Sequence, residues 1–422
     1  MARYDAEMVN SPRIPTPYGS RLRLQAIDEL RGIAVLMVML SHLPFADRLV
    51  PTSAMGEDSF LPPWIGKTLS LGHFGVALFL VISGFCIHLP WARVADRNAK
   101  INLLAFWSRR LRRLYPPYFV TLVASIGALY VLFAVVARSS GPDLGSKFGY
   151  QSTTLFVLDV IALVLLVQNV NQSSWRVGNG PFWSLALEEQ LYALYFPLLA
   201  LRRRYGWHLA LWVVFLCMVA WHVMTVLVGD RLGIQLTALG PAYWLLWALG
   251  ALVADHYARN VTLPAPLFSA LPAVVFGMVA VLLHVRADRF TWLPAEGAFQ
   301  WFFSGLAFFI VVARACRKEM RDGPSPRLAN RVLATVGVWS YSLYLTHMPS
   351  YSIAKQVALR LGASRPAVLG LRFGVALVVG YVFHRLIEVR AINWAHKKGR
   401  ASVITVAARP EVSPSSGAVP GV

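Results

Sequence analysis

Two ionisable side chains, Arg31 and His42, stand inside the first long apolar stretch of the sequence, residues 27–43. Such a stretch is typical of a membrane helix, where an ionisable residue is costly and usually functional. The eleven-residue step between them is about three full turns at ~100° per residue, so both side chains share one helix face. They are roughly 16 Å apart along the axis, about half of the hydrocarbon thickness. The spacing predicts a connection between the cytoplasmic edge of a bilayer and its middle.

His42 is the first candidate for chemistry. A neutral imidazole can accept a proton from a hydroxyl group near neutral pH, which suits a general base. The alternative is a histidine that only forms a hydrogen bond inside a helix bundle. Arg31 also has a structural interpretation, as an anchor at the cytoplasmic edge with Asp28 as its partner one turn earlier. The pair alone does not separate these interpretations.

A dense basic cluster is the second candidate. Four arginines stand just before an apolar run: Arg109, Arg110, Arg112 and Arg113. They form two pairs with a spacing of three residues, and each pair shares a helix face. Because arginine forks suit phosphate groups, we expect the cluster to hold a phosphorylated cofactor at the cytoplasmic mouth. The alternative is a basic cluster that only keeps its loop in the cytoplasm. Pro116 and Pro117 are expected to kink or start the helix, with the arginines on a bend that points them inward.

Two adjacent carboxylates, Glu188 and Glu189, are the third candidate, inside the apolar run 182–201. Two carboxylates cannot both face lipid, so at least one is expected to face the bundle interior. The helical rise places Glu188 roughly 9 Å below the outer end of its helix, at a depth similar to that of His42. We hypothesise that these two residues share a cavity. The alternative for Glu188 is a structural hydrogen bond to another helix.

Three further positions carry weaker signals. Within residues 79–85 (FLVISGF), Ser83 and Gly84 are small residues, which in membrane helices indicate close packing. His347 is a candidate for a second cavity group. Glu388 is flanked by two arginines and is expected to form an ion-pair cluster with them at the membrane interface.

Membrane helices are the elements that must position these residues. Of the 422 residues, 57% are hydrophobic and only 14% charged, and the mean hydropathy is +0.54, as in polytopic membrane proteins. The net charge of +20 comes mostly from short gaps between apolar stretches, which fits the positive-inside rule and not nucleic-acid binding. The three cysteines form neither a disulfide framework nor a metal-ligand spacing. The histidines show no metal spacing either, so no metal is expected.

Ten apolar runs are long enough to span a membrane: 27–46, 72–90, 114–137, 182–201, 206–228, 236–255, 265–286, 297–315, 331–349 and 366–389. An eleventh run covers residues 153–170. If it crossed fully, the basic cluster at 202–204 would fall outside, against the positive-inside bias. We therefore predict an all-α integral membrane protein with about ten transmembrane helices and a re-entrant or buried segment near 153–170.

The expected organisation has three parts. Residues 1–23 form a cytoplasmic segment without an apolar core, so no cleavable signal peptide is expected. Residues 24–396 form the transmembrane domain, and residues 397–422 a disordered cytoplasmic tail. This organisation predicts a multi-pass protein of the cell (inner) membrane with both termini in the cytoplasm.

Five stretches, in order along the chain, resemble acyltransferase family 3, polytopic membrane acyltransferases that modify sugars and other hydroxylated acceptors: 27–42, 79–85, 110–116, 183–192 and 341–349. The first contains the R-x10-H pattern of the family, and the third its R-x-x-R-[IL]-x-P pattern. The resemblance covers nearly all of residues 24–390 and implies that the transmembrane domain is the acyltransferase domain. Some members carry an additional C-terminal esterase-like domain, which this sequence is not expected to contain.

The resemblance implies an acyl-CoA-dependent O-acyltransferase, which moves an acyl group, often acetyl, from acyl-coenzyme A to a hydroxyl group. The donor comes from the cytoplasm in this family, and many acceptors lie outside. His42 matches the essential histidine of the family and Arg31 its partner arginine. Arg110 and Arg113 match the arginines associated with the cofactor, and Glu188 matches the glutamate of the W-S-L-x-x-E pattern. We expect Arg109 and Arg112 to assist in binding the cofactor phosphates, and a membrane-bound glycan, glycolipid or other hydroxylated compound to be the acceptor.

Two other classes of function stay open. A transporter or flippase of a polar lipid or saccharide would also use intramembrane charges and a re-entrant segment. Against it, the sequence has no inverted repeat, and an arginine cluster at one mouth suits an anionic cofactor. The other is a structural subunit of a glycan-assembly complex. The sequence also leaves open the acceptor, the acyl chain length, the oligomeric state, and whether His42 carries the acyl group covalently.

Overall fold

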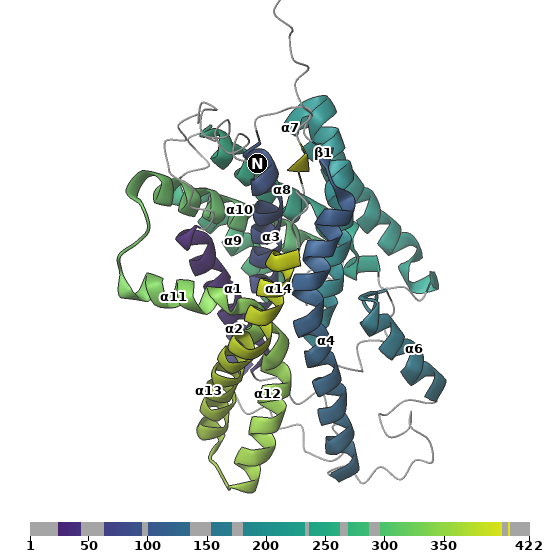
Figure 1. Ribbon diagram of the computed structural model, residues 1–422, viewed down its shortest axis with the longest axis vertical. Helices are drawn as coiled ribbons and strands as arrows, with labels where there is room; N and C mark the ends of the chain where they lie inside the picture. Colours follow the sequence, from purple (N-terminus) through teal and green to yellow (C-terminus); the bar gives the residue numbers. More distant parts are fainter. Residues whose placement is uncertain are drawn as a thin grey trace, which may run out of the picture.

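A computed structural model describes residues 24–43, 63–94, 100–135, 153–170, 180–232, 236–261, 269–286, 296–398 and 404–405. Almost all of these residues are helical, and the helices gather into one bundle (Figure 1). The expected cytoplasmic segment 1–23 and residues 406–422 of the expected tail lie outside the described residues.

The first half of the bundle contains α1 (Gln25–His42), α2 (Pro63–Ser70), η4 (Leu71–His73), α3 (Phe74–Ala92), α4 (Leu103–Val135), α6 (Thr153–Val164), η6 (Gly180–Phe182) and α7 (Trp183–Leu232). The second half contains η7 (Leu236–Ala238), η8 (Gly240–Tyr243), α8 (Trp244–Arg259), α9 (Ala270–Val285), α10 (Glu296–Asp322), α11 (Leu328–Val338), α12 (Ser340–Arg360), α13 (Arg365–Phe383), η11 (His384–Glu388) and α14 (Val389–Lys398). Two short strands, β1 (Lys100–Ile101) and β2 (Ile404–Thr405), pair antiparallel. The expected domain boundary at residue 397 stays a prediction.

Within the described residues, four helical stretches are long and apolar enough to cross a membrane: Thr68–Ala92, Gly180–Val228, Gly297–Asp322 and Pro366–Ala395. Other apolar helices are shorter, since α6, α9 and α11 contain 12, 16 and 11 residues, whereas a crossing needs about 20. The expected all-helical architecture is therefore confirmed. The count of about ten crossings is not confirmed and stays a prediction.

The segment 153–170, expected to be re-entrant or buried, contains α6 and a following turn. The 12 residues of α6 extend for about 18 Å, less than the hydrocarbon core of about 30 Å. Two tyrosines of α4 satisfy carbonyl groups at its C-terminal end: Tyr115 OH donates to Val164 O at 2.9 Å and Tyr118 OH to Leu163 O at 2.7 Å. A helix end satisfied from inside the protein suits a segment that does not cross fully.

Helix α4 begins earlier than the sequence indicated. It starts at Leu103 and contains Pro116 and Pro117 in its interior, so, of the two expected alternatives, a start of the helix at the prolines is wrong. Each proline lacks an N–H group, which leaves the carbonyl four residues earlier without its helical donor. The arginine cluster therefore lies within α4 itself, so the helical spacing assumed for its four arginines is present in the structure.

Helices α3 and α8 pack with their backbones in contact. A Cβ atom at Gly84 would overlap the carbonyl of Trp247, and one at Gly250 would overlap the carbonyl of Val81. Small residues allow this approach between membrane helices. The close-packing interpretation of Gly84 is confirmed. The same contact holds α3 against α8, where Trp247 also reaches Ser83.

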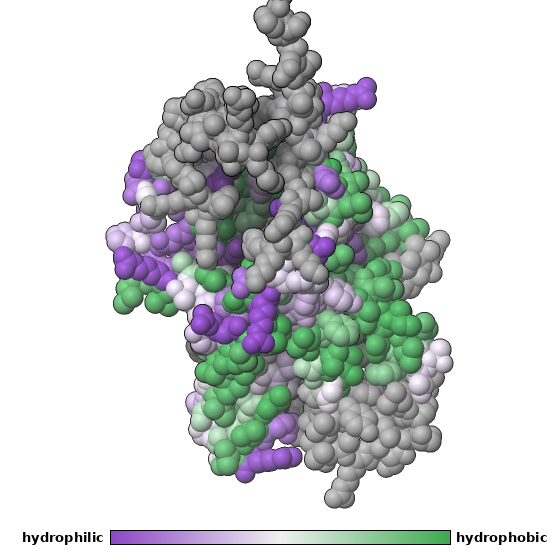
Figure 2. Space-filling model, viewed as in Figure 1, coloured by the Kyte–Doolittle hydropathy of each residue, from purple (hydrophilic) through white to green (hydrophobic). Residues whose placement is uncertain are grey.

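Large apolar side chains cover much of the outer surface (Figure 2). Examples with more than half of their surface exposed come from three helices, Val123 of α4, Leu227 of α7 and Met278 of α9. A water-soluble protein rarely exposes apolar patches of this extent. The surface supports the expected location in a membrane.

Candidate active site

A cavity of about 140 Å³ opens among α1, α3, α4, α7 and α12. A single buried water needs only about 10–15 Å³, so the cavity has room for a small organic group. Five charged residues line it: Arg31, Arg110, Arg113, Glu188 and Glu388. Hydroxyl groups come from Ser83, Ser184, Tyr192, Ser340, Tyr341 and Tyr344. Four of the seven residues selected from the sequence therefore meet in one place.

Arg31 reaches the cavity from α1 and keeps a local partner. Its Nη1 atom lies 3.6 Å from Oδ1 of Asp28, and its Nη2 atom donates to Sγ of Cys86 at 3.3 Å. The ion pair proposed from the sequence is present. The guanidinium nevertheless faces the cavity, so Arg31 is more than an anchor at the end of a helix.

The structure separates the four arginines of α4 into the two pairs that their spacing predicts. Arg110 and Arg113 line the cavity, and the guanidinium of Arg110 lies 5.2 Å from the ring centre of Tyr192. Arg109 is exposed, and Arg112 lies over the ring of Trp394 at 5.8 Å. In the part of the chain that the structure describes, neither cavity arginine has a carboxylate within 4.0 Å. Two guanidinium groups on one helix face therefore remain available to an anion from outside the protein.

Glu188 is held in a fixed position by two hydroxyl groups. Its Oε1 atom accepts hydrogen bonds from Ser83 Oγ at 2.7 Å and from Tyr192 OH at 2.5 Å. Ser83 Oγ in turn accepts a bond from Nε1 of Trp247 at 3.3 Å. The sequence alone indicates only close packing for Ser83, because its partner stands 105 positions later and no local pattern links them.

Glu388 is a cavity residue, and the predicted interfacial cluster is wrong. Its carboxylate is buried and accepts a hydrogen bond from Ser342 Oγ at 2.6 Å, with His384 Nδ1 at 2.8 Å. The flanking Arg385 and Arg390 are exposed. The reason is the π-helical turn η11, which changes the angular spacing of its residues and turns Glu388 inward.

His42 lies at the other end of α1, outside the residues that line the cavity. Its ring centre is 5.3 Å from that of His347, and its Nδ1 atom lies 2.9 Å from the carbonyl of Val38. The cavity residue Tyr344 has its ring 5.9 Å from His347. The structure thus groups Glu188 with the arginines and His42 with His347, instead of bringing Glu188 and His42 into one cavity.

The end of α1 that carries His42 is tied down by groups that the sequence did not single out. Tyr351 OH donates to the carbonyl of Met39 at 3.0 Å, and Nη1 of the buried Arg372 donates to that of Leu43 at 3.0 Å. Both acceptors are carbonyls of the last helical turn, which have no partner within the helix. These bonds fix the position of His42 from α12 and α13.

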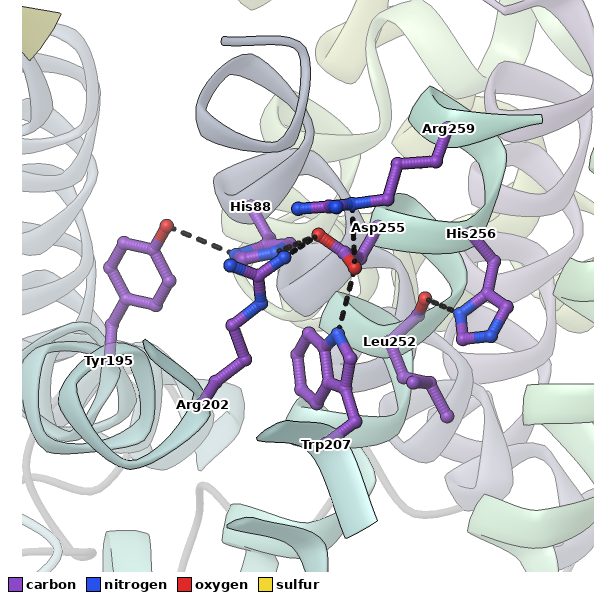
Figure 3. A network of polar contacts seen from close by, with 8 residues as sticks. All are labelled: His88, Tyr195, Arg202, Trp207, Leu252, Asp255, His256 and Arg259. Carbon is purple, nitrogen blue, oxygen red and sulfur yellow. Dashed lines mark hydrogen bonds and ion pairs between the residues drawn. The ribbon is translucent and has the colours of Figure 1, made fainter. Parts of the chain in front are cut away.

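A second charged cluster, around Asp255, joins α3, α7 and α8 (Figure 3). The carboxylate accepts hydrogen bonds from Arg202 at 2.7 Å and from Trp207 at 2.9 Å. It also forms an ion pair with Arg259 at 3.1 Å. His88 lies 3.6 Å from it. Because both oxygens are fully used inside the protein, this cluster holds helices together and does not resemble a ligand site.

Comparison with known proteins gives a consistent result. The model of a family described as "Acyltransferase domain" matches residues 24–385. A protein of Staphylococcus aureus (strain COL) that is provisionally named an O-acetyltransferase is 25% identical over 407 residues, which are 90% of this chain and 60% of that protein. O-acetyltransferase OatA of S. aureus (strain NCTC 8325 / PS 47) is 26% identical over 360 residues, 80% of this chain and 52% of that protein. The chain thus spans little more than half the length of these curated relatives. No solved structure gives a significant match.

Proposed function

The chain belongs to this acyltransferase family, and on that premise we propose that it transfers an acetyl group from acetyl-coenzyme A to a hydroxyl group of a saccharide or another hydroxylated acceptor. The names of the relatives support O-acetylation in general. The donor and the acceptor are the proposed parts. The observation that carries them is the pair of cavity arginines, Arg110 and Arg113, which have no carboxylate within 4.0 Å among the described residues.

Arg110 and Arg113 are suited to the phosphate groups of the donor. Both line the cavity from one face of α4, and guanidinium groups bind phosphates through paired, charge-assisted hydrogen bonds. Stacking of Arg110 on Tyr192 holds its side chain in place, which lowers the entropy lost when an anion binds. Arg109 and Arg112 contribute at most long-range attraction, since they lie away from the cavity lining.

The donor has to reach from the arginines to His42. Arg31 and His42 are separated by roughly 16 Å along α1, and the cavity borders only the Arg31 end. A donor with phosphates at one end and a thioester on a long flexible arm matches this separation. Tyr344, which lines the cavity and lies beside His347, marks the path between the two ends.

His42 is the proposed catalytic residue. Because a carbonyl oxygen can only accept, the contact with Val38 places the hydrogen on Nδ1 and leaves the lone pair of Nε2 for chemistry. Nε2 then removes the proton from the acceptor hydroxyl while the oxygen attacks the thioester. In a second route His42 takes the acyl group itself. An acyl-enzyme that can be trapped in the wild type and is absent from His42→Ala would support the second route.

Arg31 and Glu188 have supporting roles in this proposal. Arg31 places a positive charge beside the path of the anionic donor. Glu188, held by Ser83 and Tyr192, shapes the cavity wall near the Arg31 end of α1. We further propose that the arginine end faces the cytoplasm of a cell with the chain in its inner membrane and both termini inside, as the basic loops favour.

The central experiment measures turnover of radiolabelled acetyl-coenzyme A by the purified full-length protein in lipid nanodiscs. We expect His42→Ala to lower turnover about 100-fold or more, the usual contribution of a general base. The matched control is His222→Ala, since His222 makes the same contact with the carbonyl four residues earlier, Met218 at 2.8 Å, but lies on α7 and not at the end of α1. Wild-type turnover in His42→Ala would contradict the assignment.

The phosphate assignment has its own test. S-Acetylpantetheine carries the same thioester without the nucleotide phosphates, so its KM should be far higher than that of acetyl-coenzyme A. Equal KM values would contradict phosphate recognition. No turnover of either donor, with no protection of the protein by coenzyme A, would favour a transporter. Mass spectrometry of cell-surface glycans from a deletion strain identifies the acceptor.

A further inference from the structure

His347 is a buried imidazole that the proposed reaction does not yet use. It is 0% exposed, and its ring centre lies 5.3 Å from that of His42 with an angle of 52° between the ring planes. Two neighbours on α12 connect it to the site. Tyr344 lines the cavity, and Tyr351 donates a hydrogen bond to the turn of α1 that carries His42. The face of α12 with His347 therefore packs against the proposed base.

The hydrogen bonds of His347 fix which nitrogen carries its hydrogen. Its Nδ1 atom lies 2.8 Å from the carbonyl of Tyr344 and 3.1 Å from that of Leu343. Carbonyl oxygens only accept hydrogen bonds, so Nδ1 is the donor and Nε2 of the neutral ring has a free lone pair. This Nε2 atom is fully buried, and among the described residues it has no hydrogen-bond partner.

An unsatisfied buried acceptor needs a physical reason. Leaving such an atom without a donor destabilises a fold, and few are found in native proteins. A leucine or methionine would fill the same space between α1 and α12 without this penalty. Among the described rings that contact His347, the ring of His42 has the closest centre, at 5.3 Å against 5.8 Å for Tyr351 and 5.9 Å for Tyr344, and protonation gives Nε2 of His42 a hydrogen. The ring separation is small enough for facing ring nitrogens to come within hydrogen-bond reach after a small rotation.

We propose that His347 is a positioning residue for His42, and that its Nε2 atom accepts a hydrogen bond from the protonated His42 during acyl transfer. The inference rests on the proposed function, with His42 as general base. The acceptor O–H bond breaks and its proton forms an N–H bond at Nε2 of His42. The acceptor oxygen bonds to the carbonyl carbon, the C–S bond breaks, and the departing thiolate takes the proton. His347 gains and loses only a hydrogen bond.

The proposed role of His347 predicts a specific effect on kcat, which a packing role does not predict. A hydrogen bond to a charged group is stronger than one between neutral groups. The proposed bond between His42 and His347 forms only when His42 is charged, so it stabilises the reacting state and not the resting protein. Loss of such a bond lowers kcat and leaves donor binding unchanged. A packing role instead predicts lower stability without a specific change in kcat.

Two variants of similar side-chain volume separate the interpretations: His347→Gln and His347→Met. The glutamine amide can place an acceptor oxygen near the position of Nε2, whereas methionine supplies only apolar volume. The assay measures release of coenzyme A from acetyl-coenzyme A by the full-length protein in nanodiscs, with water as acceptor. We expect kcat of His347→Met to be at least about tenfold below that of His347→Gln, with KM for the donor unchanged within about twofold.

The same two substitutions at His222 are the matched control, because its Nδ1 atom also contacts a carbonyl four residues earlier, whereas the histidine–histidine ring pairs among the described residues do not include it. His222→Gln and His222→Met should have equal kcat. If His347→Met matches or exceeds His347→Gln, the inference is overturned and His347 is packing. That result in an active wild type leaves the proposed function intact, whereas an inactive wild type or an active His42→Ala variant overturns the proposed function itself.

Discussion

Two groups of arginines in this chain have similar chemistry and opposite surroundings. Around Asp255, Arg202 and Arg259 both bind one buried carboxylate (Figure 3). In the cavity, Arg110 and Arg113 face open volume, and within the described part of the chain neither has a carboxylate within 4.0 Å. Both groups lie on helices of the bundle, α7 and α8 in the first case and α4 in the second.

The difference teaches how to distinguish structural from functional arginines within the helix bundle. An arginine whose charge is balanced inside the protein contributes to the fold, and removing its partner leaves an uncompensated charge. An arginine beside a cavity with no internal partner keeps its full capacity for an external anion. The two groups should therefore respond to mutation through different measurements, stability in one case and donor binding in the other.

The largest expected effect comes from removing both cavity arginines. Arg110→Ala combined with Arg113→Ala should lower kcat/KM for acetyl-coenzyme A about 100-fold or more, because each charged hydrogen bond contributes about 1.5–3 kcal/mol. Steady-state kinetics in nanodiscs measures the loss. The melting temperature should stay near the wild-type value, and a protein that unfolds instead would remove the distinction between the two groups.

The second effect concerns stability. Asp255→Ala leaves Arg202 without its carboxylate, and its side chain is only 13% exposed, so we expect a loss of about 2–3 kcal/mol, somewhat below the range for fully buried pairs. Thermal unfolding of the full-length protein in detergent measures it. Asp322→Ala is the control, since its ion pair with Arg321 is exposed and its melting temperature should not change. A specific rise in KM for the donor in Asp255→Ala would show that the cluster also binds ligand.

The third effect is smaller and tests shape against charge. Arg31→Lys keeps the positive charge but cannot contact Asp28 and Cys86 at the same time as a planar fork does. We expect kcat/KM to fall about tenfold. Kinetics with acetyl-coenzyme A measures it, and a lysine variant with wild-type kinetics would mean that a point charge near the cavity is sufficient.

The smallest effect is expected for the other two arginines of α4. Arg109→Ala combined with Arg112→Ala should change kcat/KM less than about threefold, because neither side chain lines the cavity and charges separated by water are screened. The assay is the same as for the cavity pair. A loss as large as that of the cavity pair would contradict the division of α4 into two functional faces.

The sequence predicted much of the arginine end of the site. Intramembrane charges have to face the protein interior, and helical spacing separates Arg110 and Arg113 from their neighbours. Both rules are local, and they suffice for these residues and for Arg31 and Glu188. The all-helical architecture follows from apolar runs in the same way.

The remaining parts of the site depend on contacts between distant segments. Ser83 binds Glu188 across 105 positions, and His42 meets His347 only because α12 packs against the last turn of α1. The pairing of His42 with Glu188 was expected from equal depth alone. Depth along the bundle does not determine toward which neighbour each helix face points. In the structure Glu188 therefore lies with the arginines and His42 with His347.

The π-helical turn η11 makes the cavity sensitive to the number of residues in this turn. Such a turn holds about one residue more than an α-helical turn, so the helix after it keeps the register that a regular helix with one residue fewer would have. Deleting one residue within η11 would therefore restore a regular helix and leave Trp394 of α14 nearly in place over Arg112, whereas His384 and Glu388 would lose their present spacing toward Ser342. A single-codon deletion here would thus act on the cavity and spare the outer face of α4, while the same deletion in a regular helix would rotate everything after it by about 100°.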